Sequence, residues 1–102
     1  MSDTVPKRAA NMATTYRRTT HYECDELEKE LVVMERDSET IVTLNHAGYL
    51  IWEAIENPVT RGELEAAFCD SFPDLGRASI HENVGNVLDA LITAGLAFRE
   101  KE

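Results

Sequence analysis

The chain has few cysteines, no long apolar run and no signal-peptide pattern, and each shortage excludes a class of protein. Its two cysteines, Cys24 and Cys69, lie far apart and outside any CxxC pair, so they match neither a metal knuckle nor a disulfide framework. No stretch approaches the roughly twenty apolar residues of a membrane span. Lys7 and Arg8 have no apolar run behind them, unlike the start of a signal peptide. We therefore expect a cytoplasmic protein with reduced thiols and no membrane partner.

Residues that could carry catalysis or bind a metal occur only in isolation. His21 and Cys24 form one HxxC pair, but a zinc site needs a second pair and the sequence has none. Neither cysteine stands in a catalytic signature, and Cys69, next to Phe68, is interpreted as a small packing residue. The glycines are scattered singly and offer no phosphate-binding loop. We therefore expect no enzymatic activity, no cofactor and no metal ion.

Basic side chains are scarce over most of the chain. Residues 23–102 contain six Lys or Arg against eighteen Asp or Glu, a net charge of −12, whereas residues 1–22 carry +3. An acidic field of this kind repels phosphate backbones and attracts cationic partners. Most of these carboxylates form a solvated surface, but their excess excludes nucleic acid as the expected partner.

Three segments have the composition of β-strands. Residues 16–22 are rich in Thr and Tyr, residues 30–35 contain an apolar run that starts at Leu31, and residues 39–44 are largely β-branched. A polar turn over residues 35–38 joins the second and third segments and predicts a β-hairpin. We expect a three-stranded antiparallel β-meander in which residues 39–44 form an outer edge.

Apolar residues recur at helical spacing in three later segments, residues 45–56, 60–72 and 79–94. Asn45 can cap the first of these helices. Thr60 and Ser79 are each followed three residues later by Glu, the pattern of a capping box at the start of a helix. Gly95 is suited to the left-handed position that ends the third helix.

Strands followed by helices predict an α+β domain in which three helices cover one face of a small sheet. Residues 1–15 lack an apolar period and are expected to form a flexible tail, which leaves residues 16–102 as one domain. The inward-facing positions of the strands and helices predict a core of Val42, Leu44, Leu50, Ile51, Ala54, Leu64, Phe68, Val84, Leu88, Leu91 and Leu96.

The order of these motifs resembles a known family. A hairpin ends in Leu44-Asn45, a helix with Ile51-Trp52 follows, another helix starts at Thr60, and the third helix closes on the sequence LITAGL at residues 91–96. This pattern is similar to that of the PqqD-like family, also called RiPP recognition elements, over about residues 16–98. Asn57-Pro58 stands where the family has a glycine, a departure confined to one loop.

The resemblance implies a winged-helix-like peptide chaperone. Such domains bind the leader segment of a ribosomally synthesised precursor peptide and present it to a peptide-modifying enzyme. The leader would lie as an extra strand along residues 39–44, in a groove completed by the third helix. The implied peptide-binding residues are Glu39, Thr40, Ile41, Val42, Thr43, Leu44, Asn83, Val84, Val87 and Leu88.

The meander points to the same edge without the resemblance, because an outer strand has unpaired backbone groups that a visiting strand can satisfy. The acidic body favours a peptide that carries Lys or Arg. The tail over residues 1–15, or a second copy of the chain in a homodimer, is an alternative occupant of this edge.

Two other functions compete with peptide binding. A winged-helix DNA-binding regulator would use the third helix as its reader, but residues 79–94 contain no Lys or Arg and include Glu82 and Asp89. An accessory subunit that binds a folded enzyme, and no peptide, is not distinguished from a leader-binding domain by the sequence.

Overall fold

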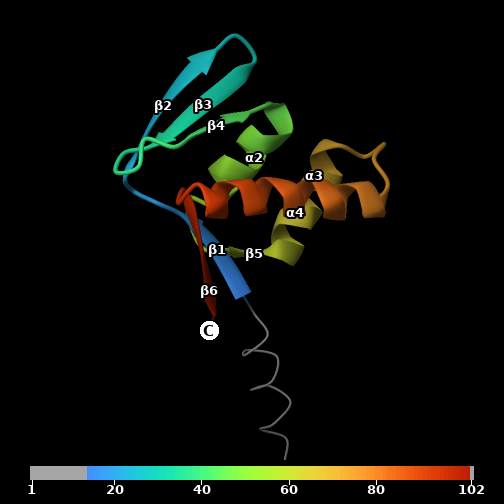
Figure 1. Ribbon diagram of the computed structural model, residues 1–102. Helices are drawn as coiled ribbons and strands as arrows, with labels where there is room; N and C mark the ends of the chain where they lie inside the picture. Colours follow the sequence, from blue (N-terminus) through green and yellow to red (C-terminus); the bar gives the residue numbers. More distant parts are fainter. Residues whose placement is uncertain (1–13, 102) are drawn as a thin grey trace, which may run out of the picture.

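The structure is a computed structural model that describes residues 14–101 (Figure 1). The tail expected over residues 1–15 therefore lies almost wholly outside the described residues, and Thr14 and Thr15 already belong to a strand. Figure 1 shows one sheet above α2 and α4 and a second sheet below them. Within the described range, none of the helices is long and apolar enough to cross a membrane.

The upper sheet is an antiparallel meander of β2 (Tyr22–Leu27), β3 (Glu30–Glu35) and β4 (Ile41–Leu44), in that order. The strands predicted over residues 30–35 and 39–44 are confirmed, and β4 lies on an outer edge as expected. The β-branched composition of these two strands suits a sheet with one buried face.

The strand predicted over residues 16–22 is wrong as the first strand of the meander. It divides into β1 (Thr14–Arg18), which belongs to the lower sheet, and the start of β2. The chain turns between them because the amide of Arg18 donates to the carbonyl oxygen of Ile55 (2.9 Å) and that of Thr19 to Leu96 (2.8 Å).

The lower sheet was not predicted. Its order is β5 (Val59–Thr60), β1 and β6 (Ala97–Lys101), with β1 antiparallel to both neighbours. Arg18 connects the two sheets, because its guanidinium lies 4.9 Å from the ring centre of Trp52 and 5.3 Å from that of Tyr22. Stacking of this kind stabilises a cation that is shielded from water.

The three predicted helices are confirmed as α2 (His46–Ala54), α3 (Arg61–Ser71) and α4 (Arg77–Thr93). Asn45 caps α2 and Thr60 forms the expected capping box with Glu63. The box predicted at Ser79 is wrong, because α4 begins two residues earlier, after Gly76, and has no side-chain cap.

Gly95 ends α4 at a φ of 78°, as expected. Its amide donates to the carbonyl oxygen of Ile92 (3.0 Å) and the next amide, that of Leu96, donates to Leu91 (2.8 Å). These two bonds make a Schellman motif, which satisfies the last carbonyl groups of the helix.

The core lies between the upper sheet and the helices. Eight of the predicted core residues are buried: Leu44, Ile51, Leu64, Phe68, Val84, Leu88, Leu91 and Leu96. Val42, Leu50 and Ala54 are only half-buried. Cys69, predicted to pack beside Phe68, is instead exposed, because adjacent helical residues point about 100° apart.

Candidate functional site

The open edge of β4 presents alternate backbone groups to solvent. The amide of Glu35 donates to the carbonyl oxygen of Thr40 (2.9 Å), and hydrogen-bonded pairs recur at every second position of an antiparallel ladder. Val42, opposite Val33, therefore turns its backbone amide inward. The amides and carbonyl groups of Ile41 and Thr43 point away from the sheet and have no strand partner among residues 14–101.

A groove of about 440 Å³ separates β4 from α4. Its helix wall consists of Asn86, Val87 and Ala90, which repeat at helical spacing and carry no charge. The remaining lining residues come from the strands and from the start of α2: Glu30, Val42, Thr43, Leu44, Asn45 and Gly48. Glu30 is the only charged residue in this lining.

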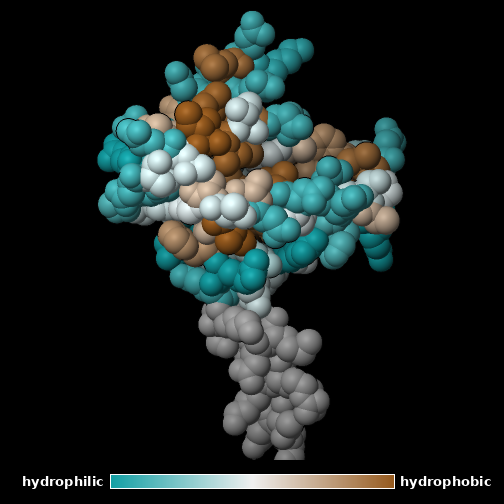
Figure 2. All heavy atoms as spheres, viewed as in Figure 1, coloured by the Kyte–Doolittle hydropathy of each residue, from teal (hydrophilic) through white to brown (hydrophobic). Residues whose placement is uncertain are grey.

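A second hollow, of about 520 Å³, lies near the start of β4. Its lining includes Thr40 from the turn, Thr93 from α4, the half-exposed ring of Phe98 and the carboxylates of Glu35 and Asp37. Figure 2 shows apolar side chains gathered over the β3–β4 region, above α4 in that view. A chain laid along β4 would thus meet apolar surface beside its backbone partners.

A tight turn fixes the start of β4. The Glu35 carboxylate accepts hydrogen bonds from the Ser38 amide (2.8 Å) and the Ser38 hydroxyl (2.9 Å). These bonds favour the ionised form and hold the pKa of Glu35 below its ordinary value, despite the opposing effect of burial. Glu39, in the same turn, adopts a left-handed φ of 59°.

The structure divides seven of the ten predicted peptide-binding residues into two groups. Val42, Thr43, Leu44 and Val87 line the groove directly, and Thr40 lines the second hollow. Val84 and Leu88, by contrast, are 0 % and 2 % exposed and lie in the core behind the groove, where they support its helix wall.

Three other predicted residues lie outside the lining of the main groove. Glu39 and Ile41 are exposed, and Ile41 contributes its outward backbone groups. Asn83 is exposed and donates to the carbonyl oxygen of Ser79 (2.9 Å).

The sequence-based reasoning missed Asn86 and Ala90, which are central to the helix wall. Asn86 lies three residues after Asn83 and Ala90 three residues after Val87, so counting helical steps from these two predicted residues would have found them. Asn45 and Gly48 were missed as lining residues because their place beside β4 depends on how α2 leaves the strand.

No three His, Cys, Asp or Glu residues among residues 14–101 are grouped so that they could hold a metal ion. Cys24 and Cys69 are both free and exposed. The groove offers backbone hydrogen bonds and apolar contacts, and these are means of binding.

The family described as coenzyme PQQ synthesis protein D (PqqD) matches residues 30–97, the stretch from β3 to the first residue of β6. No curated protein sequence matches the chain.

Two solved structures have a similar fold. One, titled "TbiB1 in Complex with the TbiA(beta) Leader Peptide", shares 20% sequence identity with a TM-score of 0.67, over 79% of this chain and 93% of that one. The other, "Lasso peptide synthetase B1 complexed with the leader peptide", shares 16% identity with a TM-score of 0.66, over 81% and 96%. At these identities the likeness is one of fold.

Proposed function

Because the chain belongs to the family of coenzyme PQQ synthesis protein D, we propose that it binds the leader segment of a ribosomally synthesised precursor peptide. In this role it presents the peptide to a separate modifying enzyme and performs no chemistry itself. The two structural neighbours are both complexes with leader peptides, which supports this role. The free, exposed thiols suit a reducing cytoplasm, where such a precursor is made.

The single observation that carries the proposal is the open edge of β4 beside a groove whose helix wall carries no charge. A leader peptide would add a fourth strand there, because Ile41 and Thr43 each offer one amide and one carbonyl group to it. Its alternate side chains would enter the groove against Val42, Val87 and Ala90. Backbone bonds would supply affinity, and the shape of the groove would supply selectivity.

The affinity follows from opposing contributions. Up to four backbone hydrogen bonds contribute roughly 2–6 kcal/mol net, and two buried apolar side chains add about 1.5–3 kcal/mol each. Lost freedom on association opposes binding by about 4–15 kcal/mol. We expect a dissociation constant between about 10 nM and 10 μM, which corresponds to roughly −11 to −7 kcal/mol.

A proline substitution on β4 tests the proposal. Proline removes one backbone amide and is tolerated on an edge strand where that amide faces solvent. Ile41→Pro removes an outward amide, whereas Ile41→Ala removes most of the same side chain and keeps the amide. A random 12-residue peptide library displayed on mRNA and selected against the protein supplies a ligand, which is then titrated into both variants by calorimetry.

Peptide binding should be lost or much weakened in Ile41→Pro and largely kept in Ile41→Ala, with both folded by circular dichroism. Val42→Pro serves as a positive control for damage to the fold, because its amide pairs with β3. Equal, undiminished binding by Ile41→Pro would show that the peptide does not pair with β4, and the proposal would fail.

A further inference from the structure

The upper sheet has a second open edge, on β2. The amide of Arg36 donates to the carbonyl oxygen of His21 (3.0 Å), so the hydrogen-bonded pairs of this ladder continue at Glu23, Asp25 and Leu27. Tyr22, Cys24 and Glu26 therefore turn their backbone groups away from β3. No strand among residues 14–101 pairs with this edge.

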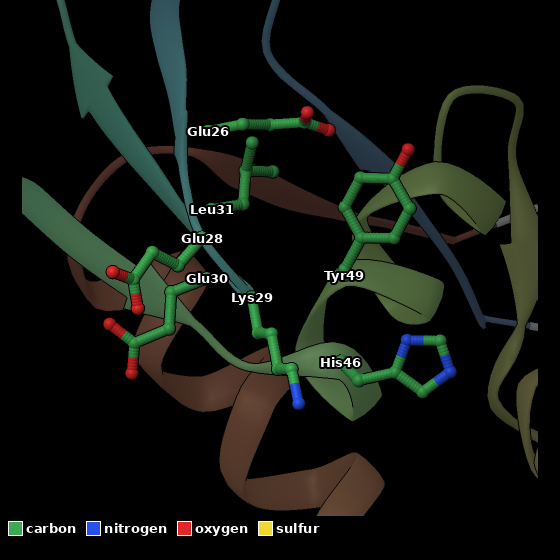
Figure 3. Close-up of a pocket in the computed structure, with 7 residues that line it drawn as sticks. All are labelled: Glu26, Glu28, Lys29, Glu30, Leu31, His46 and Tyr49. Atoms are coloured by element: carbon green, nitrogen blue, oxygen red, sulfur yellow. The ribbon is translucent and has the colours of Figure 1, made fainter.

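A groove also accompanies this second edge. Two hollows, of about 180 Å³ and 370 Å³, lie between β2 and α2 and share Glu26, Leu31 and Tyr49 in their linings. Figure 3 shows the first hollow, with Glu26 and Tyr49 reaching toward one end and Lys29 and His46 at the other. The sheet thus has a strand-and-helix groove at each edge, β4 with α4 and β2 with α2.

The two grooves differ in charge. The lining of the β2–α2 groove contains five carboxylates, Asp25, Glu26, Glu28, Glu30 and Glu53. Its cations are Lys29 and Arg18, of which Arg18 is already stacked on Trp52 and donates to its carbonyl oxygen (3.1 Å). The β4–α4 groove has Glu30 alone.

The aromatic side chains of the β2–α2 groove, like its carboxylates, suit a cationic ligand. Tyr22 and Tyr49 are half-buried and line it. Arg18 already lies 5.3 Å from the ring centre of Tyr22, so Tyr49 is the ring that remains for the cation of a ligand. A cation over an aromatic face is attracted by the ring, and a nearby carboxylate adds to that attraction. An extended chain on this edge would place every second side chain over the groove.

We propose that the β2–α2 groove docks an extended segment of a partner protein that carries Lys or Arg at alternate positions. The segment pairs with the outward backbone groups of Tyr22, Cys24 and Glu26, and its cations lie among the carboxylates and against Tyr49. The proposal does not depend on peptide binding at β4, because the two edges lie on opposite sides of β3.

A basic peptide of defined sequence tests the proposal. The probe is acetyl-(Lys-Thr)4-amide, which combines alternating charge with good strand propensity, and acetyl-(Glu-Thr)4-amide is its control. In ¹⁵N NMR titrations of the full chain, the Lys-Thr peptide should shift the amides of β2 and α2 and bind less tightly in 300 mM than in 50 mM NaCl. The Glu-Thr peptide should cause no shifts.

A pair of matched double variants separates the groove from the general acidity of the protein. Glu26→Gln with Glu53→Gln removes one carboxylate from each wall, and Glu82→Gln with Asp89→Asn removes the same charge from the exposed surface of α4. The first pair should weaken Lys-Thr peptide binding by about 3- to 10-fold, and the second by less than about 2-fold.

The backbone contribution is tested at Cys24, the middle of the three outward positions. Cys24→Pro removes the outward amide, whereas Cys24→Ala removes the same thiol and keeps the amide. The proline variant should bind the Lys-Thr peptide about 3- to 10-fold more weakly than the alanine variant. Both should bind the β4 ligand selected above equally well, so the two proposals can fail separately.

Three results would overturn docking at this edge. One is an absence of amide shifts with the Lys-Thr peptide, and another is shifts confined to β4 and α4, which would place the basic peptide in the first groove. The third is an equal loss of affinity in the two double variants, because attraction would then come from overall charge.

Discussion

The backbone of Gly48 lies directly against Leu44, since a Cβ atom added to the glycine would come within 3.0 Å of Leu44 Cδ2 and 3.1 Å of Leu44 Cβ. Leu44 is the last residue of β4, and Gly48 lies in the first turn of α2. Both line the β4–α4 groove. The absence of a side chain at position 48 lets α2 approach the strand and so sets one end of the groove.

Gly48→Ala should therefore be destabilising although alanine is the better helix former. Overpacking against Leu44 costs about 1–3 kcal/mol, and the gain in helix propensity offsets about 1 kcal/mol of this. We expect a net loss of about 1 kcal/mol in the free energy of unfolding, measured by urea denaturation. Gly62→Ala is the control, because its nearest atom would be 3.9 Å away, and it should be neutral or stabilising.

Leu88→Ala should destabilise the protein by about 2–5 kcal/mol, because it leaves a cavity in the core. Leu88 is 2 % exposed and lies behind the wall of the β4–α4 groove. Asp89→Ala, at the exposed neighbouring position, should change the free energy of unfolding by less than about 0.5 kcal/mol. An unchanged thermal melt for Leu88→Ala would contradict the helix orientation.

Ser38→Ala should raise the pKa of Glu35 toward its ordinary value, because it removes the hydroxyl that donates to the carboxylate. The pKa should remain below that value, since the backbone amide at position 38 still donates. A ¹³C NMR titration of the Glu35 carboxyl measures both. Ser71→Ala, at an exposed position on α3, should leave the pKa of Glu35 unchanged.

The same substitution should have a pH-dependent effect on stability. A carboxyl whose folded pKa lies below its unfolded pKa stabilises the fold above the unfolded pKa and loses this effect as the pH falls through the folded pKa. The extra stability of the wild type over Ser38→Ala should thus be complete above about pH 5 and shrink under more acidic conditions. A difference that grew on acidification would contradict this assignment.

Duplex DNA should not bind in a salt-dependent manner. Arg77 is the only Lys or Arg in α4 and stands at its first residue, while Glu82 and Asp89 are exposed along the helix. These charges oppose phosphate contact, and no counterions would be released. Fluorescence anisotropy with a labelled duplex at 50 mM and 200 mM NaCl checks this, and affinity that falls steeply with salt would favour a DNA-binding role.

Local signals were enough to predict the elements with strong patterns. Thr60 with Glu63 marked the start of α3, Asn45 marked the start of α2 and Gly95 marked the end of α4, because each acts through its immediate backbone neighbours. The capping pattern at Ser79 predicted the wrong start for α4. Such a pattern is local, and nothing in it prevents the helix from starting earlier.

Strand partners were not predictable in the same way. The acidic sequence of β2 has weak strand propensity, and it forms a strand because its backbone pairs with β3 along its whole length. Tyr16 was correctly placed in a strand but in the wrong sheet, because propensity describes one chain segment and pairing depends on two.

The sequence by itself determined the class of fold, the open β4 edge and most of the core, because alternation and helical spacing follow from local geometry. The tertiary structure decided which core positions stand behind the groove, as Val84 does, and which line it, as Ala90 does. It also decided that β2 is a second open edge, and that its groove brings Glu53 of α2 together with the carboxylates of the β2–β3 hairpin. These features could not be predicted from the sequence, because each depends on how a strand and a distant helix pack against the same core.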